Sequence, residues 1–306
     1  MPAALLTTLL FAISALCAYR TARQIGGVEA NFWRICTATV FLGLWANLFG
    51  DGLGGAAFPI FVLSGVLGIG VGDSGYFQAL PRLGSRRTVL LTQCLTAPVA
   101  ALVEWLWLGT RLNVPEILCI AVILIGVVIA LAPEEHLKIP ARDLRTGILF
   151  SLVSALGGSL GAVLIRKAYA VAEAAGEHPD AGTTGYQRVL GGLFIPGLIL
   201  LAVKWRAARG RRSFFEVESL RATRDKWRRL WPWLLANSLA GQTLGVTCMQ
   251  WALKTTPTGI VTAVIATTPL ALLPLTRFVE GEKIGLRPLL GALIAVTGVI
   301  GLALWY

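Results

Sequence analysis

The sequence predicts an all-α integral membrane protein with ten transmembrane helices, arranged as two inverted five-helix repeats. Low charge, long apolar blocks and an internal repeat lead to this fold class. Of the 306 residues, 56% are apolar and 14% charged, and the mean hydropathy is +0.72. Soluble domains carry about 25% charged residues. A helix crosses the hydrocarbon with about 20 apolar residues, and blocks such as 115–133 and 287–306 supply them.

The first five helices lie between polar or Gly/Pro breaks, at 3–19, 30–49, 57–80, 88–108 and 114–132. The first of them has the length of a signal peptide. However, its positive charges, Arg20 and Arg23, follow the apolar run instead of preceding it, so we expect a retained span.

The same breaks place the remaining helices at 146–166, 185–203, 230–253, 259–279 and 286–305. These helices use the whole chain and leave no room for a soluble domain. They also divide it into a first repeat, 1–135, and a second repeat, 136–306, which contains a basic loop at 204–229.

An internal repeat supports the division. Residues 58–80 align with residues 231–253 at an offset of 173, pairing Gly68 with Gly241 and Gly72 with Gly245. "TAPVAAL" (96–102) matches "TTPLALL" (267–273). In the second helix of each half, Arg34 aligns with Arg188. Because each half holds an odd number of spans, the second copy enters the membrane from the opposite side, as in many secondary transporters.

The distribution of Lys and Arg predicts the orientation. Alternate loops hold 20 positive residues on one side and 4 on the other. The positive-inside rule then puts both termini outside the cytoplasm, in a multi-pass protein of a bacterial plasma membrane. Segment 204–231 carries a net charge of +7. We expect it to act as an orientation signal and to contact anionic lipids, with an interfacial helix over 214–229.

Several function classes are disfavoured. The net charge of +11 lies in membrane loops and not on a soluble basic face, so we expect no nucleic acid partner. The five scattered cysteines and two loop histidines predict neither a disulfide framework nor a metal site. No GxxxxGK[ST] motif and no catalytic cluster occur, so we expect no ATP, no cofactor and no enzyme activity. The sequence indicates no oligomeric state.

The motifs resemble those of the EamA-type family of the drug/metabolite transporter superfamily over essentially the whole chain. The third-helix endings "GYFQAL" and "CMQWAL" and the Pro-containing fourth-helix segments resemble family motifs, as does the Gly281-Glu282 turn before the last helix. Arg34 and Arg188 stand where the family has an arginine near the start of the second helix of each unit.

The resemblance implies ten spans, a central cavity between the halves and alternating-access transport of a small organic solute. We expect an exporter or exchanger of a metabolite, an amino acid or an amphipathic drug-like compound. The alternative is a flippase for a lipid-linked sugar or another anionic lipid. Three features depart from the family: Thr110 replaces the expected Glu, the first and sixth spans lack an acid, and the charge count opposes the usual cytoplasmic termini.

Asp73 interrupts the apolar run 65–80, about 10 Å from the end of its helix. An ionised carboxylate at such a depth costs at least about 2.5–3.5 kcal/mol on insertion scales. It must therefore face water, pair with a cation or stay protonated. Its counterpart in the second half is Val246, so the fold does not need the acid. Substrate-amine binding, proton coupling and a structural pair with Arg34 or Arg188 all stay open.

Arg34 and Arg188 have two interpretations. They are expected mainly to hold the scaffold, because both halves keep them near a helix end. The alternative is recognition of a carboxylate or phosphate by paired guanidinium groups.

Other residues complete the expected site. The glycine pairs Gly68/Gly72 and Gly241/Gly245 predict close helix packing, and Pro98 and Pro269 predict a hinge or kink. Polar and aromatic groups expected near the cavity or at the membrane interface are Tyr76, Gln78, Gln93, Gln242, Gln250 and Trp251. Glu104 is expected to pair with Arg111 or to reach water, and Glu282 to cap the turn before the last helix.

Overall fold

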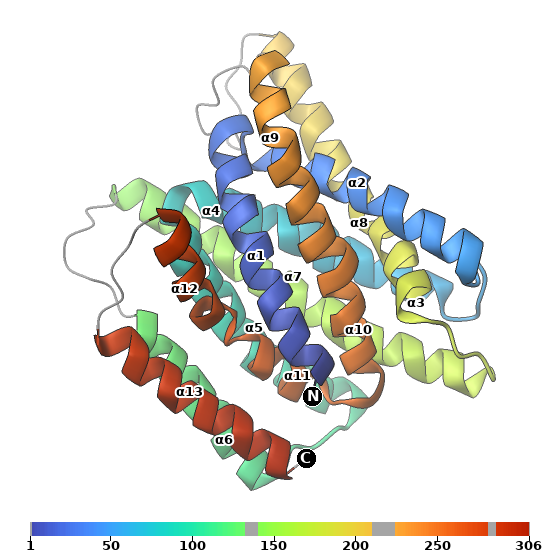
Figure 1. The fold of residues 1–306 in the computed structure, drawn as a ribbon. Helices are drawn as coiled ribbons and strands as arrows, with labels where there is room; N and C mark the ends of the chain where they lie inside the picture. The colour runs from blue at the N-terminus through green and yellow to red at the C-terminus, as the bar shows by residue number, and fades with distance from the viewer. Residues whose placement is uncertain (1, 132–139, 210–223, 281–285, 306) are drawn as a thin grey trace.

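The computed structural model describes residues 2–131, 140–209, 224–280 and 286–305, and within these ranges the chain contains helices and no strands. In chain order the elements are α1 (Pro2–Ile25), α2 (Gly27–Phe49), α3 (Phe58–Gly65), η1 (Val66–Asp73), α4 (Ser74–Leu83), α5 (Ser85–Leu108), α6 (Val114–Leu131), α7 (Ala141–Ala174), α8 (Ala181–Ala208), α9 (Arg224–Asn237), η2 (Ser238–Gly245), α10 (Val246–Thr255), α11 (Thr258–Ile265), α12 (Thr268–Glu280) and α13 (Leu286–Trp305). They form one helical bundle (Figure 1).

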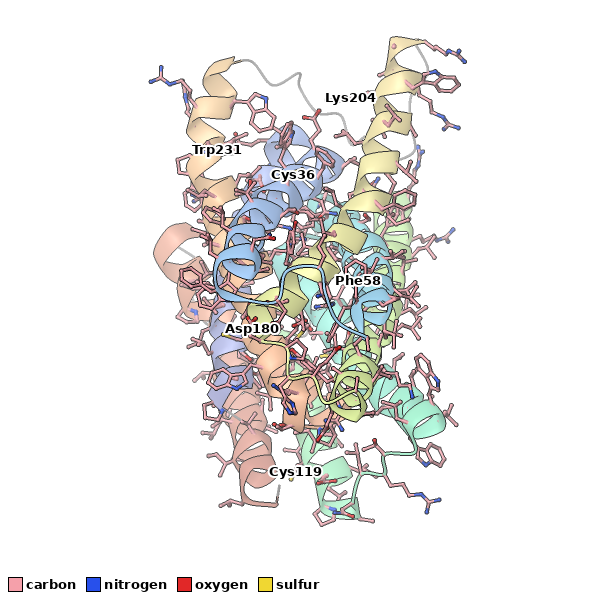
Figure 2. All side chains as sticks on the ribbon, turned by 90° about the vertical axis from the view of Figure 1, so that its right-hand side faces the viewer. Cys36, Phe58, Cys119, Asp180, Lys204 and Trp231 are labelled. Atoms are coloured by element: carbon pink, nitrogen blue, oxygen red, sulfur yellow. The ribbon has the colours of Figure 1, made fainter. Side chains whose placement is uncertain are left out.

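The described helices support a multi-pass membrane protein. Seven helical stretches are long and apolar enough to cross a bilayer, and α6 and α13 contain the shorter apolar stretches Val114–Ile129 and Leu290–Gly301. Large apolar side chains project outward along the helices (Figure 2), among them Leu106, 71% exposed, and Leu201, 68% exposed. Such a surface suits lipid. The all-helical membrane class is therefore confirmed, whereas the count of ten helices stays a prediction.

Single glycines join two pairs of helices. Gly26 separates α1 from α2 with a φ of 84°, and Gly84 separates α4 from α5 with a φ of 81°. Residues with a side chain rarely adopt this conformation, so glycine permits a direct turn. The polar segments on either side, which we expected to be loops, are therefore helical up to the glycine.

Two helices contain wide turns at matching positions. The helical run from Phe58 to Leu83 is π-helical over η1, and the run from α9 to α10 is π-helical over η2. We expected helices at 57–80 and 230–253, and both runs are helical, but their π-helical segments were not predicted. A π turn bonds each N–H to the carbonyl five residues earlier, which widens the helix and often marks a functional site.

A break divides the predicted helix 259–279. α11 ends at Ile265 and α12 starts at Thr268, directly before Pro269. The counterpart in the first half, α5, runs unbroken through Pro98, whose side chain is exposed on the outside of the bundle. Of the two prolines expected to act as hinges, Pro269 therefore lies beside a break and Pro98 lies within a continuous helix.

Asp180 fixes the start of α8. One carboxylate oxygen, Oδ1, accepts hydrogen bonds from the backbone N–H groups of Gly182 (2.8 Å) and Thr183 (3.1 Å). These N–H groups have no partner inside the helix, and an Asp at this position satisfies them. The same oxygen accepts a bond from the indole Nε1 of Trp45 at 2.9 Å, which ties α8 to α2. The helix therefore begins four residues before the predicted start at 185.

The internal repeat relates a first part, α1 to α6, to a second part, α7 to α13, and equivalent helices of the two parts run antiparallel. In α6 and α13, which lie side by side in Figure 1, Gly126 faces Ala295 while Gly298 faces Cys119 and Ile123. In α2 and α8, Gly182 faces Trp45 and Gly185 faces Leu42. Glycine allows the backbones of α6 and α13 to approach closely, and in α8 it leaves room for the side chains of Trp45 and Leu42.

The first helix of each part packs on the other part. α7 packs on α3, η1, α4 and α5, whereas α1 packs on α9, η2, α10 and α12. Glycine again lies at both contacts. A Cβ on Gly161 would be 2.7 Å from the Cα of Gly68, and one on Gly245 would be 2.7 Å from the ring of Phe11. The predicted packing glycines Gly68, Gly72, Gly241 and Gly245 thus lie in the two π-helical segments, where these helices cross.

The residues that flank the basic segment lie towards one end of the bundle. Figure 2 shows Lys204 and Trp231, which flank the basic segment, towards one end and Cys119 at the other. Of the interfacial helix expected over 214–229, residues 224–229 belong to α9 and the rest lie outside the described residues. Gly281 and Glu282 also lie outside them.

Candidate functional site

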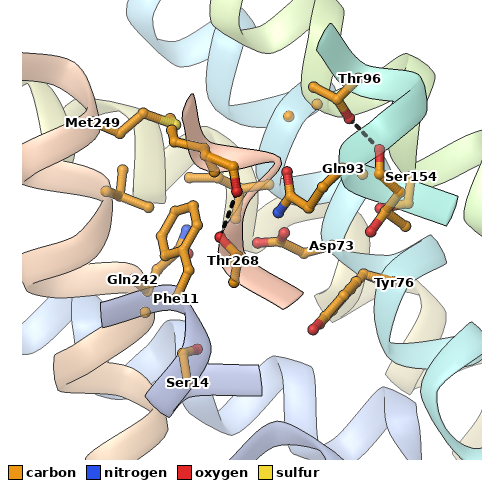
Figure 3. A pocket seen from close by; sticks show the side chains of 18 of the residues that line it. Phe11, Ser14, Asp73, Tyr76, Gln93, Thr96, Ser154, Gln242, Met249 and Thr268 are labelled. Carbon is orange, nitrogen blue, oxygen red and sulfur yellow. Dashed lines mark hydrogen bonds between the residues drawn. The ribbon is translucent and has the colours of Figure 1, made fainter. Parts of the chain in front are cut away.

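A cavity of about 150 Å³ lies between the two parts of the chain. Its wall is built from α1, α2, η1, α4 and α5 on one side of the sequence and from α7, α8, η2, α10, α11 and α12 on the other. Figure 3 shows Asp73, Tyr76 and Gln93 at the same hollow as Gln242 and Thr268. Polar groups from distant segments thus converge on one space.

Nine of the fifteen residues singled out from the sequence line this cavity. They are Arg34, Gly68, Gly72, Asp73, Tyr76, Gln93, Arg188, Gly241 and Gln242. The three charged residues among them are two arginines and one aspartate, and they are also the only charged groups among the described residues of the wall.

The remaining predicted residues lie elsewhere. Gln78 accepts a hydrogen bond from Arg82 at 2.9 Å and lines a separate, mostly apolar pocket. The Gln250 side chain is buried and donates to the carbonyl of Ala181 at 3.2 Å. Trp251 is 66% exposed on the outer surface, where an interfacial anchor would lie. Gly245 lies at the contact with Phe11 of α1, Pro98 is exposed on the outside of α5, and Pro269 is buried beside the break between α11 and α12.

Arg34 is held by a network that includes Asp73. Its Nη2 lies 2.6 Å from Oδ2 of Asp73 and donates to Oδ1 of Asn31 at 2.9 Å. Its Nη1 donates to Oε1 of Gln242 in η2 at 3.2 Å. The guanidinium also lies over the ring of Phe77, 4.8 Å from its centroid. The ion pair expected as the structural role of Asp73 therefore exists, and it faces the cavity.

Arg188 occupies the matching place in the second part with a different set of contacts. Its Nε donates to Oγ of Ser64 at 2.9 Å, and the residue is 2% exposed. Its Nη1 has no hydrogen-bond partner in the described parts of the chain. The contact with Ser64 links α8 to α3 across the two parts.

Hydroxyl side chains form much of the wall, and the sequence analysis missed them. They are Ser14, Thr92, Thr96, Ser154, Thr262 and Thr268. The hydroxyls of Thr92, Thr96 and Thr262 donate to carbonyls of their own helices, as is common within helices. The spacing of Thr92 and Thr96, one helical turn apart on an apolar span, was the available signal.

The Thr268 side chain satisfies a backbone carbonyl at the break beside the cavity. In an unbroken helix the carbonyl of Ile265 would accept a hydrogen bond from the N–H of residue 269, which proline lacks. The hydroxyl of Thr268 donates to that carbonyl at 2.6 Å instead. Both Ile265 and Thr268 line the cavity, so the break forms part of its wall.

Glu104 joins the two parts outside the cavity. Its Oε1 accepts from Nε of Arg166 at 3.0 Å and its Oε2 from the backbone N–H of Thr258 at 2.6 Å. The expected pairing with Arg111 or with water was wrong, because the side chain is 2% exposed and turns towards α7 and α11. Glu104 thus caps α11 and neutralises Arg166.

The family model of EamA-like transporters matches residues 1–132 and 145–304, which is nearly the whole chain in two segments. The chain belongs to the EamA-like transporter family. This confirms the resemblance inferred from the motifs. Members of this family are membrane transporters and not enzymes, and a small-molecule substrate follows from membership.

A solved structure has the same fold. This crystal structure of a protein aligns with a TM-score of 0.70 and 16% identity, over 99% of this chain and 97% of that chain. A comparison with curated proteins gives no match. Among the described residues, no group of three or more His, Cys, Asp or Glu side chains could hold a metal ion.

Proposed function

We propose that this EamA-like protein is a secondary active transporter that moves a small metabolite or drug-like solute by alternating access. Its ten membrane spans form two inverted five-helix units, residues 1–135 and 136–306. The observation that carries the proposal is the polar cavity between these units, lined by both. The antiparallel pairing of α6 with α13 and of α2 with α8 supports the inverted arrangement, since equivalent helices of inverted units run in opposite directions.

The substrate path passes between the units, and the predicted residues that line the cavity contact the solute. Rocking of one unit against the other exposes the cavity to each side in turn. The interruptions in the cavity wall support this motion. The π segments η1 and η2 and the break between α11 and α12 are points where a helix can bend at lower cost.

Asp73 is the group through which protons are coupled to transport. It is the one acidic side chain among the described residues of the cavity wall, and its partner Arg34 lies beside it. A carboxyl that alternates between binding a proton and pairing with a guanidinium changes the charge of the cavity by one unit. The direction of transport in this proposal is export or exchange.

The charge distribution supports a bacterial plasma-membrane protein with both termini outside the cytoplasm. The basic loop 204–229 then faces the cytoplasm, where it contacts anionic lipid headgroups.

Reconstitution in proteoliposomes tests the proposal. Purified protein is incorporated into vesicles of bacterial lipid, and uptake is measured for a panel of radiolabelled, water-soluble metabolites with and without a pH gradient. Saturable uptake of a water-soluble solute, absent from protein-free vesicles, is expected. Movement of a lipid-linked sugar between leaflets, with no uptake of any soluble solute, would instead establish the flippase alternative.

A further inference from the structure

Arg188 is a buried cation without a described counterion. Arg188 lines the cavity and the residue is 2% exposed, yet no ion pair in the described ranges includes it. Its hydrogen bond to Ser64 uses Nε, and Nη1 has no partner there. A buried charge that is not paired carries a large desolvation penalty.

The internal repeat explains why the counterion is missing. In the first part Arg34 pairs with Asp73 at 2.6 Å. The position equivalent to Asp73 in the second part is Val246, which also lines the cavity. The described wall therefore contains two guanidinium groups and one carboxylate, an excess of one positive charge.

A second unsatisfied donor faces the same space. Oε1 of Gln242 accepts the hydrogen bond from Arg34, and this contact fixes the orientation of the amide. The Nε2 of the same side chain is buried and has no hydrogen-bond partner within the described residues. Both unsatisfied groups are donors, so a ligand rich in acceptors would satisfy them.

We propose that the transported solute is a small organic monoanion whose carboxylate pairs with Arg188. This inference rests on the proposed transport function and specifies its substrate class. A carboxylate supplies the missing charge and accepts hydrogen bonds in the geometry that a guanidinium offers. Phe11, Val246 and Met249 provide apolar wall for the rest of the solute. A volume of about 150 Å³ matches that of cavities that hold benzene.

Matched anions and neutral amides test the substrate class without transport. The melting temperature of the purified protein in detergent is measured with benzoate or benzamide, and with 3-methylbutanoate or 3-methylbutanamide, at constant ionic strength set with sodium chloride. In each pair the two molecules have nearly the same shape and differ in charge. At least one anion is expected to raise the melting temperature, with a dissociation constant at least about tenfold lower than that of its amide.

Two variants assign the effect to Arg188. Arg188→Gln removes the charge and should abolish the preference for the anion. Val246→Asp keeps Arg188 and adds the missing counterion, so it should also abolish the preference for the anion. This second variant tests the inference even if Arg188→Gln fails to fold. Arg206→Gln, on an exposed face of the same helix, is the control and should bind like the unmodified chain.

The outcomes separate this inference from the function on which it rests. It is overturned if neither anion stabilises the protein more than its amide, or if Val246→Asp binds the anion unchanged. Stronger stabilisation by valine, a zwitterion with the carbon skeleton of 3-methylbutanoate and an added ammonium group, would also overturn it. The transport function itself fails only if the reconstituted vesicles move no solute.

Discussion

Arg34 and Asp73 are 39 residues apart in the sequence, and Nη2 of one lies 2.6 Å from Oδ2 of the other. The arginine is 5% exposed, and the Asp73 side chain is 28% exposed on its cavity side. This pair explains how an acid is tolerated within an apolar run. It also explains why Arg188, whose equivalent partner is Val246, differs from its counterpart.

The Arg34–Asp73 pair should show strong energetic coupling. Removing one partner of a buried ion pair costs about 3–5 kcal/mol, and we expect a smaller loss here because Asp73 is partly exposed. Arg34→Gln and Asp73→Asn should each lower the free energy of unfolding, and the double variant should be more stable than the sum of the two losses predicts. Unfolding in a denaturing detergent measures this. Additive losses would mean that the pair contributes nothing.

Asp73→Asn should also uncouple transport from the proton gradient. An amide cannot bind and release the proton, so solute uptake in proteoliposomes should stop responding to a pH gradient while exchange of solute continues. Asp51→Asn, at an exposed position outside the cavity, is the matched control and should keep the response. An unchanged pH response in Asp73→Asn would assign coupling to another group.

Two adjacent glycines in α7 should respond differently to alanine. A Cβ on Gly157 would lie 2.7 Å from the carbonyl oxygen of Leu67 and 2.8 Å from the N of Gly72, so Gly157→Ala must push α7 away from η1. A Cβ on Gly158 would lie 3.8 Å from Oγ1 of Thr96, an ordinary contact. We expect Gly157→Ala to lower the melting temperature by several degrees and Gly158→Ala to leave it unchanged or raise it. Equal melting temperatures for the two variants would contradict this packing.

Glu104→Gln should weaken the junction between α5, α7 and α11. The neutral amide leaves the Arg166 guanidinium without its carboxylate and weakens the cap on Thr258. A hydrogen bond to a charged group contributes about 1.5–3 kcal/mol, and a loss of that order is expected in the free energy of unfolding. Glu173→Gln, at an exposed position in α7, serves as the control. A loss no larger than the control's would show that the junction is not stabilising.

The orientation predicted from the loop charges can be measured with fusions. Alkaline phosphatase, which is active only outside the cytoplasm, should be active when fused after Tyr306 and inactive when inserted near residue 215 in the basic loop. The reverse pattern would mean that the charge count does not set the topology.

Composition and the apolar blocks were enough to predict the membrane class, and the repeated motifs led to the family. Nine residues of the cavity wall were also recognised, whereas its hydroxyl side chains were not. Asp73, Arg34 and Arg188 were recognisable because charges are rare in apolar spans. The pairing of Glu104 with Arg166 was not, since it depends on which helices of the two parts meet. The exposed position of Trp251 was not recognisable either, because an aromatic residue near the end of a span is compatible with both a cavity wall and a membrane interface.

Irregularities in the helices were also hidden from the sequence. The sequences of η1 and η2 look like ordinary apolar helix. Their residue pattern does not reveal that the backbone hydrogen bonds there reach five residues back instead of four. Pro98 and Pro269 look alike in the sequence, yet only Pro269 lies at a break. Their burial also differs, because Pro98 is exposed on the outside of α5 and Pro269 is buried.

The exchange of α1 and α7 between the two parts has a consequence for biosynthesis. α1 is made before the helices α9 to α12 that cover much of its surface, since these begin only at Arg224. Until then its polar residues, such as Ser14, lack their final partner, Asn237. The nascent N-terminal part therefore stays incompletely packed in the bilayer until α9 to α12 are made. A truncated chain ending before α9 would expose the same surface and would be a substrate for membrane quality control.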